Sequence, residues 1–447
     1  LAAAVAVASV GGPSGAADIG TIAPGAGADA AVGATAPFVD MEVVTIFQTG
    51  SLTSTVRSAA ISAATSVGSP SAIGRGFTAP LVRVRRGATV VQQSLGSGWA
   101  FPMAITAFSV DVVRALMGRA NSAPLAAGQV VMGQTSAALR GAQVGDLLDF
   151  RLATGATLTF VLGRIAPDIE VGGTEIVMSL DQATRLGATS DTSVVIFSPL
   201  DRTAIMSALQ RNGLIGNSAV RVRTTWDPFD PDLTLSLART KQLLGEFDID
   251  YANLTADGWT SINPTWLANN LPSSRELYPT GVRARCHKTI AANLRSALTE
   301  INTSYPFLVN NSSDALASTT GIDVVNTNTY GGCSSGQARF SRSSSTIGSI
   351  SRHSWGQAID MSTVANCQGC IPKFDCRIVR VFRKFGFSWG GNYLRPDGMH
   401  FEWVGEARNN FAYPSTYCPN TVAASLGVAS APDARAVLFA DHGWTDH

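Results

Sequence analysis

At 447 residues the chain is too long for one ordinary hydrophobic core, so we expect two or three domains. The composition is typical of globular proteins, with 45% hydrophobic and only 15% charged residues. Because the formal net charge is +1, neither a nucleic acid nor an anionic membrane surface is expected as a partner.

The first 35 residues differ in composition from the rest of the chain. Residues 1–10 are almost entirely apolar but too few to span a bilayer, and they are typical of the end of a signal peptide or of a membrane anchor. Residues 11–35 are rich in Gly, Ala and Pro, which predicts a flexible linker. We therefore expect a secreted or extracytoplasmic protein of the cell envelope, with a possible N-terminal membrane anchor.

Residues 36–220 are predicted to form a separate α/β domain of unknown role. Short β-branched or alternating runs, bounded by Gly, Asp and Pro, predict its strands. These runs are 43–47, 81–84, 147–152, 157–162, 175–178 and 194–197. The third and fourth runs flank residues 153–156 and predict a hairpin. Helices are predicted over 180–186 and over 201–212, where Asp201 would be the N-cap.

Residues 221–277 are predicted to be a connector. Aspartates and prolines at 226–231 indicate a turn-rich break, and a helix is predicted within 232–247. The last domain is expected over 278–420, and a polar tail over 421–447.

The last domain is predicted to be α+β, a small domain with a central antiparallel sheet and flanking helices. Apolar residues at helical spacing from 282 to 301 predict one helix, and those from 378 to 385 predict a second. Residues 321–329 are predicted to form a strand. Residues 389–403 are predicted to form a turn followed by a strand.

All six cysteines of the chain lie in this last domain, which indicates three disulfides in an exported protein. They are Cys286, Cys333, Cys367, Cys370, Cys376 and Cys418. A structural zinc site is the alternative interpretation, because two of the cysteines form a CxxC pair. Six cysteines allow 15 pairings, and the sequence does not choose among them.

A histidine and an aspartate seven residues apart form the first chemically informative motif. The segment reads Ser351-x-His353-x-x-Gly356-x-Ala358-x-Asp360. Glycine permits a tight turn or a close backbone approach between the two polar residues. On a strand, Asp360 would share a face with the small residue Ala358, which leaves room for a metal ion.

The second motif is Asp397-Gly398-Met399-His400-Phe401-Glu402. Two imidazoles and one carboxylate can bind zinc and leave its fourth position open to water, as catalytic zinc sites do. His353, Asp360 and His400 are therefore the predicted ligands. Asp397 is the predicted general base, provided that Gly398 allows a bend. Glu402 is the competing base, or a partner that orients a ligand.

Together these segments resemble the zinc peptidases that cut bacterial cell-wall peptides, over roughly residues 280–415. This M15-type group includes D-alanyl-D-alanine carboxypeptidases and L-alanyl-D-glutamate endopeptidases. The resemblance implies zinc bound by His353, Asp360 and His400, with Asp397 as catalytic base. Carboxypeptidase members usually have Glu at the base position, so Asp397 looks more like the endopeptidase branch.

The same resemblance implies an arginine that stabilises the oxyanion. The usual Tyr-Arg pair is absent because Gly331 follows Tyr330, so Arg339 is the predicted residue and Arg342 the alternative. Four aromatic residues are predicted either to line a peptide cleft or to belong to the core. They are Trp355, Trp389, Tyr393 and Trp403.

Residues 144–187 resemble part of the periplasmic core domain attached to some bacterial permease subunits, over roughly 80–215. This resemblance implies an envelope protein partner bound through residues 36–220. The function expected for the whole chain is hydrolysis of peptide bonds in peptidoglycan stem peptides, with Zn2+ as cofactor. The alternative is a non-catalytic protein that binds the cell wall or an envelope complex.

Overall fold

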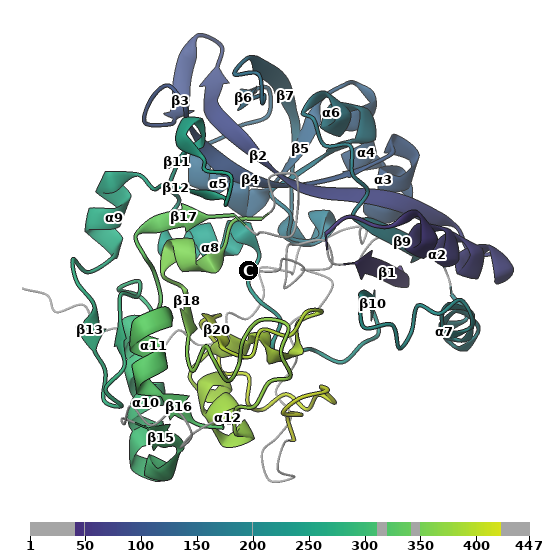
Figure 1. The fold of residues 1–447 in the computed structure, drawn as a ribbon. Coiled ribbons are helices and arrows are strands. Elements are labelled where there is room, and N and C mark those ends of the chain that lie inside the picture. The colour runs from purple at the N-terminus through teal and green to yellow at the C-terminus, as the bar shows by residue number, and fades with distance from the viewer. Residues whose placement is uncertain (1–40, 49, 199, 311–319, 341–348, 422–447) are drawn as a thin grey trace, which may run out of the picture. The chain divides into compact units, whose positions relative to one another are not determined.

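The computed structural model describes residues 41–48, 50–198, 200–310, 320–340 and 349–421. The predicted anchor or signal remnant, the linker and nearly all of the tail lie outside these residues. The described part is a mixed α+β structure, which confirms the predicted class at this level (Figure 1). Among the described residues, no helix combines the length and hydrophobicity needed to cross a membrane.

Six strands of the N-terminal region close into a mixed barrel, because the first and last strands of the series also pair with each other. In barrel order they are β2 (Ser71–Arg86), β6 (Leu147–Arg151), β7 (Thr157–Ala166), β5 (Val130–Gly133), β8 (Ile176–Ser179) and β4 (Trp99–Phe108). Two of the pairings are parallel, β4 with β8 and β5 with β7. The predicted α/β domain is thus a closed mixed barrel with helices (Figure 1).

Strand β2 is long enough to serve both the barrel and an extension of the sheet. Its first residues, Ser71–Gly74, pair with β9 (Ser193–Phe197), while later residues pair with β4 and β6. Strand β1 (Val43–Gln48) lies between β9 and β10 (Val220–Thr224). Strand β3 (Thr89–Gln93) pairs with β2. Interior positions carry large apolar residues such as Met103, Phe150 and Phe160, which fill the barrel.

The predicted strands of this region all exist, although several are longer than predicted. The hairpin of β6 and β7 is confirmed, with Leu152 N–H donating to Ala156 O across the turn. Helices α6 (Leu180–Arg185) and α7 (Arg202–Arg211) are confirmed as well, and the Asp201 side chain caps α7. The other helices of the region are α2 (Ser54–Ser66), α3 (Val110–Met117), α4 (Arg119–Ala126), α5 (Gln134–Arg140) and η1 (Asp168–Val171).

Residues 221–277 contact both the barrel and the last region. Helix α8 is shorter than predicted, Leu237–Leu244, because Ser236 caps its N-terminus. Its buried Lys241 pairs with Glu175 of the barrel region at 3.0 Å. The other elements are β11 (Ile249–Asp250), which pairs with β4, η2 (Tyr251–Asn253), β12 (Trp259–Ser261), α9 (Pro264–Asn270) and β13 (Glu276–Leu277). The division of the chain at 220 and 277 stays a prediction.

The last region contains the predicted small antiparallel sheet, in the order β18 (Ala358–Asp360), β20 (His400–Trp403) and β19 (Phe387–Trp389). Helix α12 (Cys376–Lys384) packs against β19, and α10 (Ala291–Ser304) packs against α12 (Figure 1). The remaining elements are β14 (Arg283–Ala284), η3 (Pro306–Leu308), β15 (Val309–Asn310), β16 (Ile322–Asp323), α11 (Val324–Tyr330), β17 (Gln337–Arg339), η4 (Arg352–Trp355) and η5 (Gly390–Asn392).

Two predictions of local structure in this region were wrong. The helix expected from 282 begins only at Ala291, although the earlier apolar residues Val282 and Cys286 are buried in the same core. The strand expected over 321–329 ends at Asp323. The Asp323 carboxylate accepts a hydrogen bond from Asn326 N–H and starts helix α11 instead, as an N-cap does.

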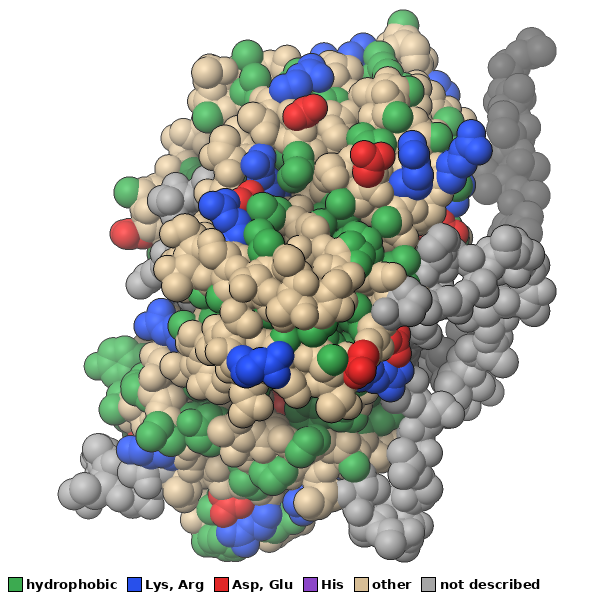
Figure 2. Space-filling model, turned by 90° about the vertical axis from the view of Figure 1, so that its right-hand side faces the viewer, with side chains coloured by type: hydrophobic (Ala, Val, Ile, Leu, Met, Phe, Trp, Pro, Cys, Tyr) green, Lys and Arg blue, Asp and Glu red, His purple; other side chains and the backbone are tan. Residues whose placement is uncertain are grey.

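Acidic and basic side chains are interspersed on the face of the molecule shown in Figure 2. This mixture accords with the formal net charge of +1. The interior contains a histidine that belongs to neither of the two predicted motifs. His287 is 1% exposed, and burial lowers its pKa to about 4.

His287 is expected to make the protein less stable in acid. Its ring contacts Leu244 O through Nε2 at 3.1 Å, and its Nδ1 accepts from Thr289 N–H at 3.1 Å. A second ring proton would therefore remove an acceptor. Because the folded pKa lies below the unfolded value of about 6.5, stability should fall as pH drops from about 6.5 to 4, by about 3 kcal/mol. Denaturant unfolding across this pH range should show a smaller loss of stability for His287→Gln than for the parent protein. An equal loss of stability would show that His287 does not cause the acid sensitivity.

Candidate metal centre

The two motifs converge because β18 and β20 are antiparallel neighbours. Asp360 and His400 lie directly opposite each other in this pair. His353 lies on the short helix η4, which begins after Ser351, whose side chain accepts from His353 N–H at 3.3 Å. One nitrogen of each histidine and one oxygen of Asp360 thus come within 4.8 Å of one another, a group that could hold a metal ion.

These three atoms form a nearly equilateral triangle. His353 Nε2 lies 3.1 Å from Asp360 Oδ1 and 3.2 Å from His400 Nδ1, and His400 Nδ1 lies 3.2 Å from Asp360 Oδ1. Ligands about 2.0–2.1 Å from a tetrahedral zinc ion are separated by about 3.3 Å. The triangle therefore fits one face of a zinc tetrahedron. Its three members would supply three ligands to such an ion, with the fourth position left for water or substrate.

Gly356 makes the turn from η4 into β18 possible. Its φ of +64° lies in the left-handed region, and a Cβ atom there would lie 2.9 Å from His287 N. The two backbone segments are also hydrogen-bonded at this point, because His287 N–H donates to Gly356 O at 3.0 Å. The glycine predicted between the two ligands is therefore required both by the turn and by close packing.

Each histidine has a partner on the side that faces away from the triangle. His353 Nδ1 lies 2.6 Å from Cys333 O, which fixes the tautomer that turns Nε2 toward the triangle. His400 Nε2 lies 3.6 Å from Glu402 Oε2, and the other oxygen of Glu402 lies 3.4 Å from Arg352 Nε. Glu402 therefore lies behind a predicted ligand. This position favours an orienting role over that of a base.

The charges of the triangle stabilise one another. Burial alone would raise the pKa of Asp360, but His353 and His400 outweigh burial and hold this pKa well below its usual range. Burial would likewise lower the pKa of His400, yet its hydrogen bonds with Asp360 and Glu402 raise this pKa to about 10. The Asp360 carboxyl is thus held in its anionic form, the form in which it could bind a metal ion.

Asp397 is a buried carboxylate next to the triangle, 1% exposed. Burial, followed by the charge of Asp360, raises the pKa of Asp397 to about 7. Among the described residues its Oδ1 atom has no hydrogen-bonding partner. A carboxyl group with a pKa near neutrality is suited to proton transfer.

The bend predicted at Gly398 exists, but its cause differs from the expected one. His400 N–H donates to Asp397 O at 3.1 Å and closes a tight turn. Gly398 does not adopt a positive φ. A Cβ atom there would instead lie 3.0 Å from Pro372 Cβ and 3.2 Å from Asn366 Cβ, so close packing disfavours a larger residue.

Arg339, the predicted oxyanion residue, lies on β17 beside η4. Its backbone N–H donates to Ser354 Oγ at 3.1 Å, and its guanidinium lies over the Trp259 ring. Its positive charge lowers the pKa of Asp397, as does that of Arg395, which the sequence did not suggest. Arg342, the alternative, lies outside the described residues.

The aromatic residues near the motifs belong to the interior. Trp355 and Trp389 are 0% and 1% exposed, and Trp403 is buried in the same core. Tyr393 is also buried, with its ring centroid 6.0 Å from that of His400. The core alternative is therefore the correct one for the tryptophans.

All six cysteines form disulfides, which excludes the zinc–thiolate alternative. The pairs are Cys286–Cys333, Cys367–Cys370 and Cys376–Cys418. Three disulfides suggest an extracytoplasmic location. The first pair also anchors the residue whose carbonyl contacts His353.

Removing the Cys286–Cys333 disulfide is expected to weaken both the fold and metal binding. Its loop of 47 residues corresponds to about 4 kcal/mol of chain entropy. The Cys286→Ser/Cys333→Ser variant should lose stability in this range, and its metal affinity should fall roughly 10-fold because Cys333 O is less well held. Cys376→Ser/Cys418→Ser is the matched control, which should lose stability without losing affinity. Equal affinity in the two variants would contradict this account.

A cleft of about 880 Å³ lies beside the turn that carries Asp397. Tyr393, Arg395 and Pro396 line one wall, and residues 214–222 of the barrel region line another. A volume of this size falls in the range of small-molecule sites.

A His/Asp/His group with one open face and a neighbouring buried carboxyl defines a candidate metal centre of the catalytic type. Residues 345–403 match the model of an M15 peptidase family that is described as D-alanyl-D-alanine carboxypeptidase. The predicted resemblance is thus confirmed for this segment. The match does not extend to residues 80–215, so the permease resemblance is unsupported. No curated protein matches the chain.

Proposed function

We propose that the last region of the chain is a zinc peptidase that hydrolyses peptide bonds in bacterial cell-wall stem peptides. The observation that carries this proposal is the triangle of His353, Asp360 and His400 within a segment that matches a carboxypeptidase family. The donor set of two imidazoles and one carboxylate is typical of catalytic zinc. Bound zinc would acidify water and polarise the scissile carbonyl.

Asp397 acts as general base and then as general acid in this proposal. Its carboxylate takes the proton of the attacking water and delivers it to the leaving amine. Arg339 contributes positive charge beside the developing oxyanion. Glu402 keeps the His400 ring oriented, while the Cys333 carbonyl does the same for His353.

The test is release of D-alanine from a peptide that ends in D-Ala-D-Ala, using protein loaded with one equivalent of zinc. Release that stops with a chelator and returns with zinc would support the proposal. A peptide cut instead after L-Ala would assign the endopeptidase reaction. Chelator-insensitive binding to cell wall without cleavage would favour the non-catalytic alternative.

A further inference from the structure

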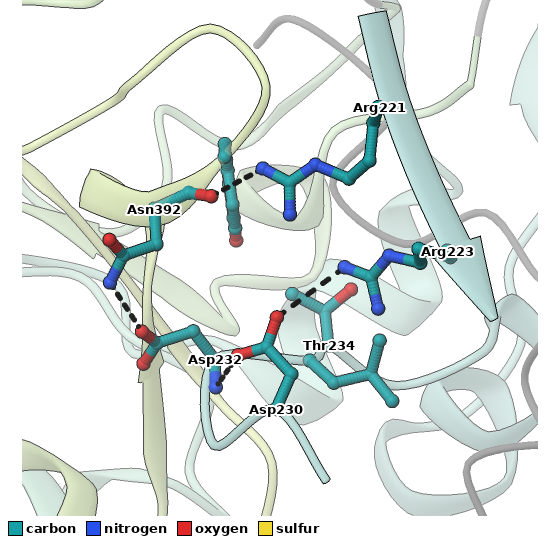
Figure 3. A pocket seen from close by; sticks show the side chains of 8 residues that line it. Arg221, Arg223, Asp230, Asp232, Thr234 and Asn392 are labelled. Carbon is teal, nitrogen blue, oxygen red and sulfur yellow. Dashed lines mark hydrogen bonds and ion pairs between the residues drawn. The ribbon is translucent and has the colours of Figure 1, made fainter. Parts of the chain in front are cut away.

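A largely buried and mostly polar cluster joins β10 and the segment after it to the loop that precedes Asp397. Its members come from β10, from the segment that follows β10 and from η5 (Figure 3). They are Arg221, Arg223, Asp230, Asp232, Leu233, Thr234, Asn392 and Tyr393. None of these residues is a predicted metal ligand or base, so the peptidase chemistry does not explain why this cluster is charged.

Asp232 is the centre of this cluster, with four hydrogen bonds to its carboxylate. Arg383 of α12 donates from Nε at 2.9 Å and from a terminal nitrogen at 2.5 Å. Trp389 N–H donates at 3.1 Å, and Asn392 Nδ2 donates at 2.9 Å. Asp232 is only 4% exposed, and hydrogen bonds to a buried charge are stronger than those between neutral groups.

Two of these donors are the two ends of one loop, Trp389–Asn392. The carbonyl between them, Gly390 O, accepts from Asp397 N–H at 2.9 Å and from Tyr393 N–H at 3.0 Å. The loop that Asp232 holds is therefore bonded directly to the backbone of the predicted base. Trp389 also donates through Nε1 to Gly398 O at 2.8 Å, in the turn between Asp397 and His400.

Strand β10, at the end of the sheet that extends from the barrel, and the segment that follows it hold the same loop from the other side. Arg221 of β10 donates to Asn392 O at 2.5 Å. Asp230 accepts from Asp232 N–H at 2.9 Å and pairs with Arg223 at 3.5 Å. Figure 3 shows Arg221 and Asp232 directed at Asn392 from two different segments.

We propose that Asp232 is a positioning residue for the candidate peptidase site, which holds the Trp389–Asn392 loop and, through Gly390, the backbone of Asp397. The inference rests on the proposed function for its catalytic consequence. It also makes β10, through Arg221, part of the structure that orients the base. The family match at 345–403 contains the loop but not Asp232, so this support comes from outside the matched segment.

Two variants and one control test the proposal. Asp232→Asn removes the charge, but it also removes the buried partner of Arg383. Asn392→Ala removes one of the two loop contacts with the carboxylate, together with the Asn392 hydrogen bonds to Tyr417, and leaves the Trp389 N–H contact and the Asp232–Arg383 pair intact. The control is Asp146→Asn, another buried carboxylate, whose partners Arg86 and Gln143 both belong to the barrel region.

Amide hydrogen exchange in residues 389–400 and steady-state kinetics with a D-Ala-D-Ala peptide are measured for each variant. We expect exchange in this segment to rise about tenfold and kcat to fall roughly 10- to 100-fold in both loop variants, with KM and zinc stoichiometry unchanged. The control should change neither. If Asp232→Asn does not fold, Asn392→Ala still tests the contact between Asn392 and the Asp232 carboxylate.

Unchanged amide exchange or unchanged kcat in folded Asp232→Asn and Asn392→Ala would overturn the proposal. An equal fall of kcat in the Asp146→Asn control would also overturn it. Exchange needs no substrate. A parent protein without hydrolytic activity would therefore refute the proposed function, while the exchange result would still decide whether Asp232 holds the loop.

Discussion

Replacing His400 with alanine is expected to abolish stoichiometric zinc binding and, with it, peptide hydrolysis. The variant lacks one of the three candidate ligands. In the parent protein, His400 Nδ1 lies 3.2 Å from both His353 Nε2 and Asp360 Oδ1. Partners that only orient a ligand are worth about 10- to 100-fold in metal affinity, so loss of a ligand should cost more than roughly 100-fold. Isothermal titration with zinc and the D-alanine release assay measure the two effects.

The matched control for this change is His287→Gln. His287 is buried like His400, but it hydrogen-bonds to Leu244 O and Thr289 N–H and is not part of the triangle. The His287→Gln variant should bind one zinc ion with the affinity of the parent protein. Zinc binding retained by folded His400→Ala would show that the metal lies elsewhere.

Replacing Asp397 with asparagine is expected to leave zinc binding intact and lower kcat by about 10²- to 10⁴-fold, the range of a general base. The amide has the size of the carboxylate but cannot accept the water proton. Glu402→Gln is the companion variant. Because Glu402 lies behind His400, it should lower zinc affinity about 10-fold or more and affect kcat less. The reverse pattern would make Glu402 the base.

The pH profile should report the same carboxyl group. Asp397 must be deprotonated to act as base, so kcat/KM should rise with pH through its pKa of about 7. A bound cation would lower this pKa and move the rise to lower pH. The folded pKa lies above the unfolded value of about 3.9, so the ionised group costs stability as pH rises from about 4 to 7. Chelator-treated Asp397→Asn should therefore be more heat-resistant than chelator-treated parent at pH 8, and equal resistance would contradict this burial argument.

The site was easier to predict from the sequence than the fold around it. Histidine is rare in this chain, with five residues in total, so two His segments with carboxylates at fixed offsets stood out. The convergence of Asp360 and His400 follows from one antiparallel strand pair. The contact of His353 with Cys333 O had no sequence signal, because any residue supplies a backbone carbonyl.

Barrel closure could not be predicted, since it depends on the pairing of β2 with β4 and not on any local pattern. Strand β4 also reads as a continuous apolar run, which periodicity does not distinguish from a buried helix. Asp232 was missed for a related reason. It was placed at the start of a predicted helix, directly after a turn-rich break, and only the tertiary structure brings it to Arg383 and the loop before Asp397.

The most direct test of the account is mass spectrometry of purified peptidoglycan after incubation with the zinc-loaded protein, with and without chelator. The account predicts new peptide termini that appear only without chelator, either from loss of D-Ala or from a cut after L-Ala. The Asp397→Asn variant, loaded with one zinc, should yield almost none. Intact peptidoglycan after incubation with folded parent protein that holds one zinc would contradict the proposed peptidase function.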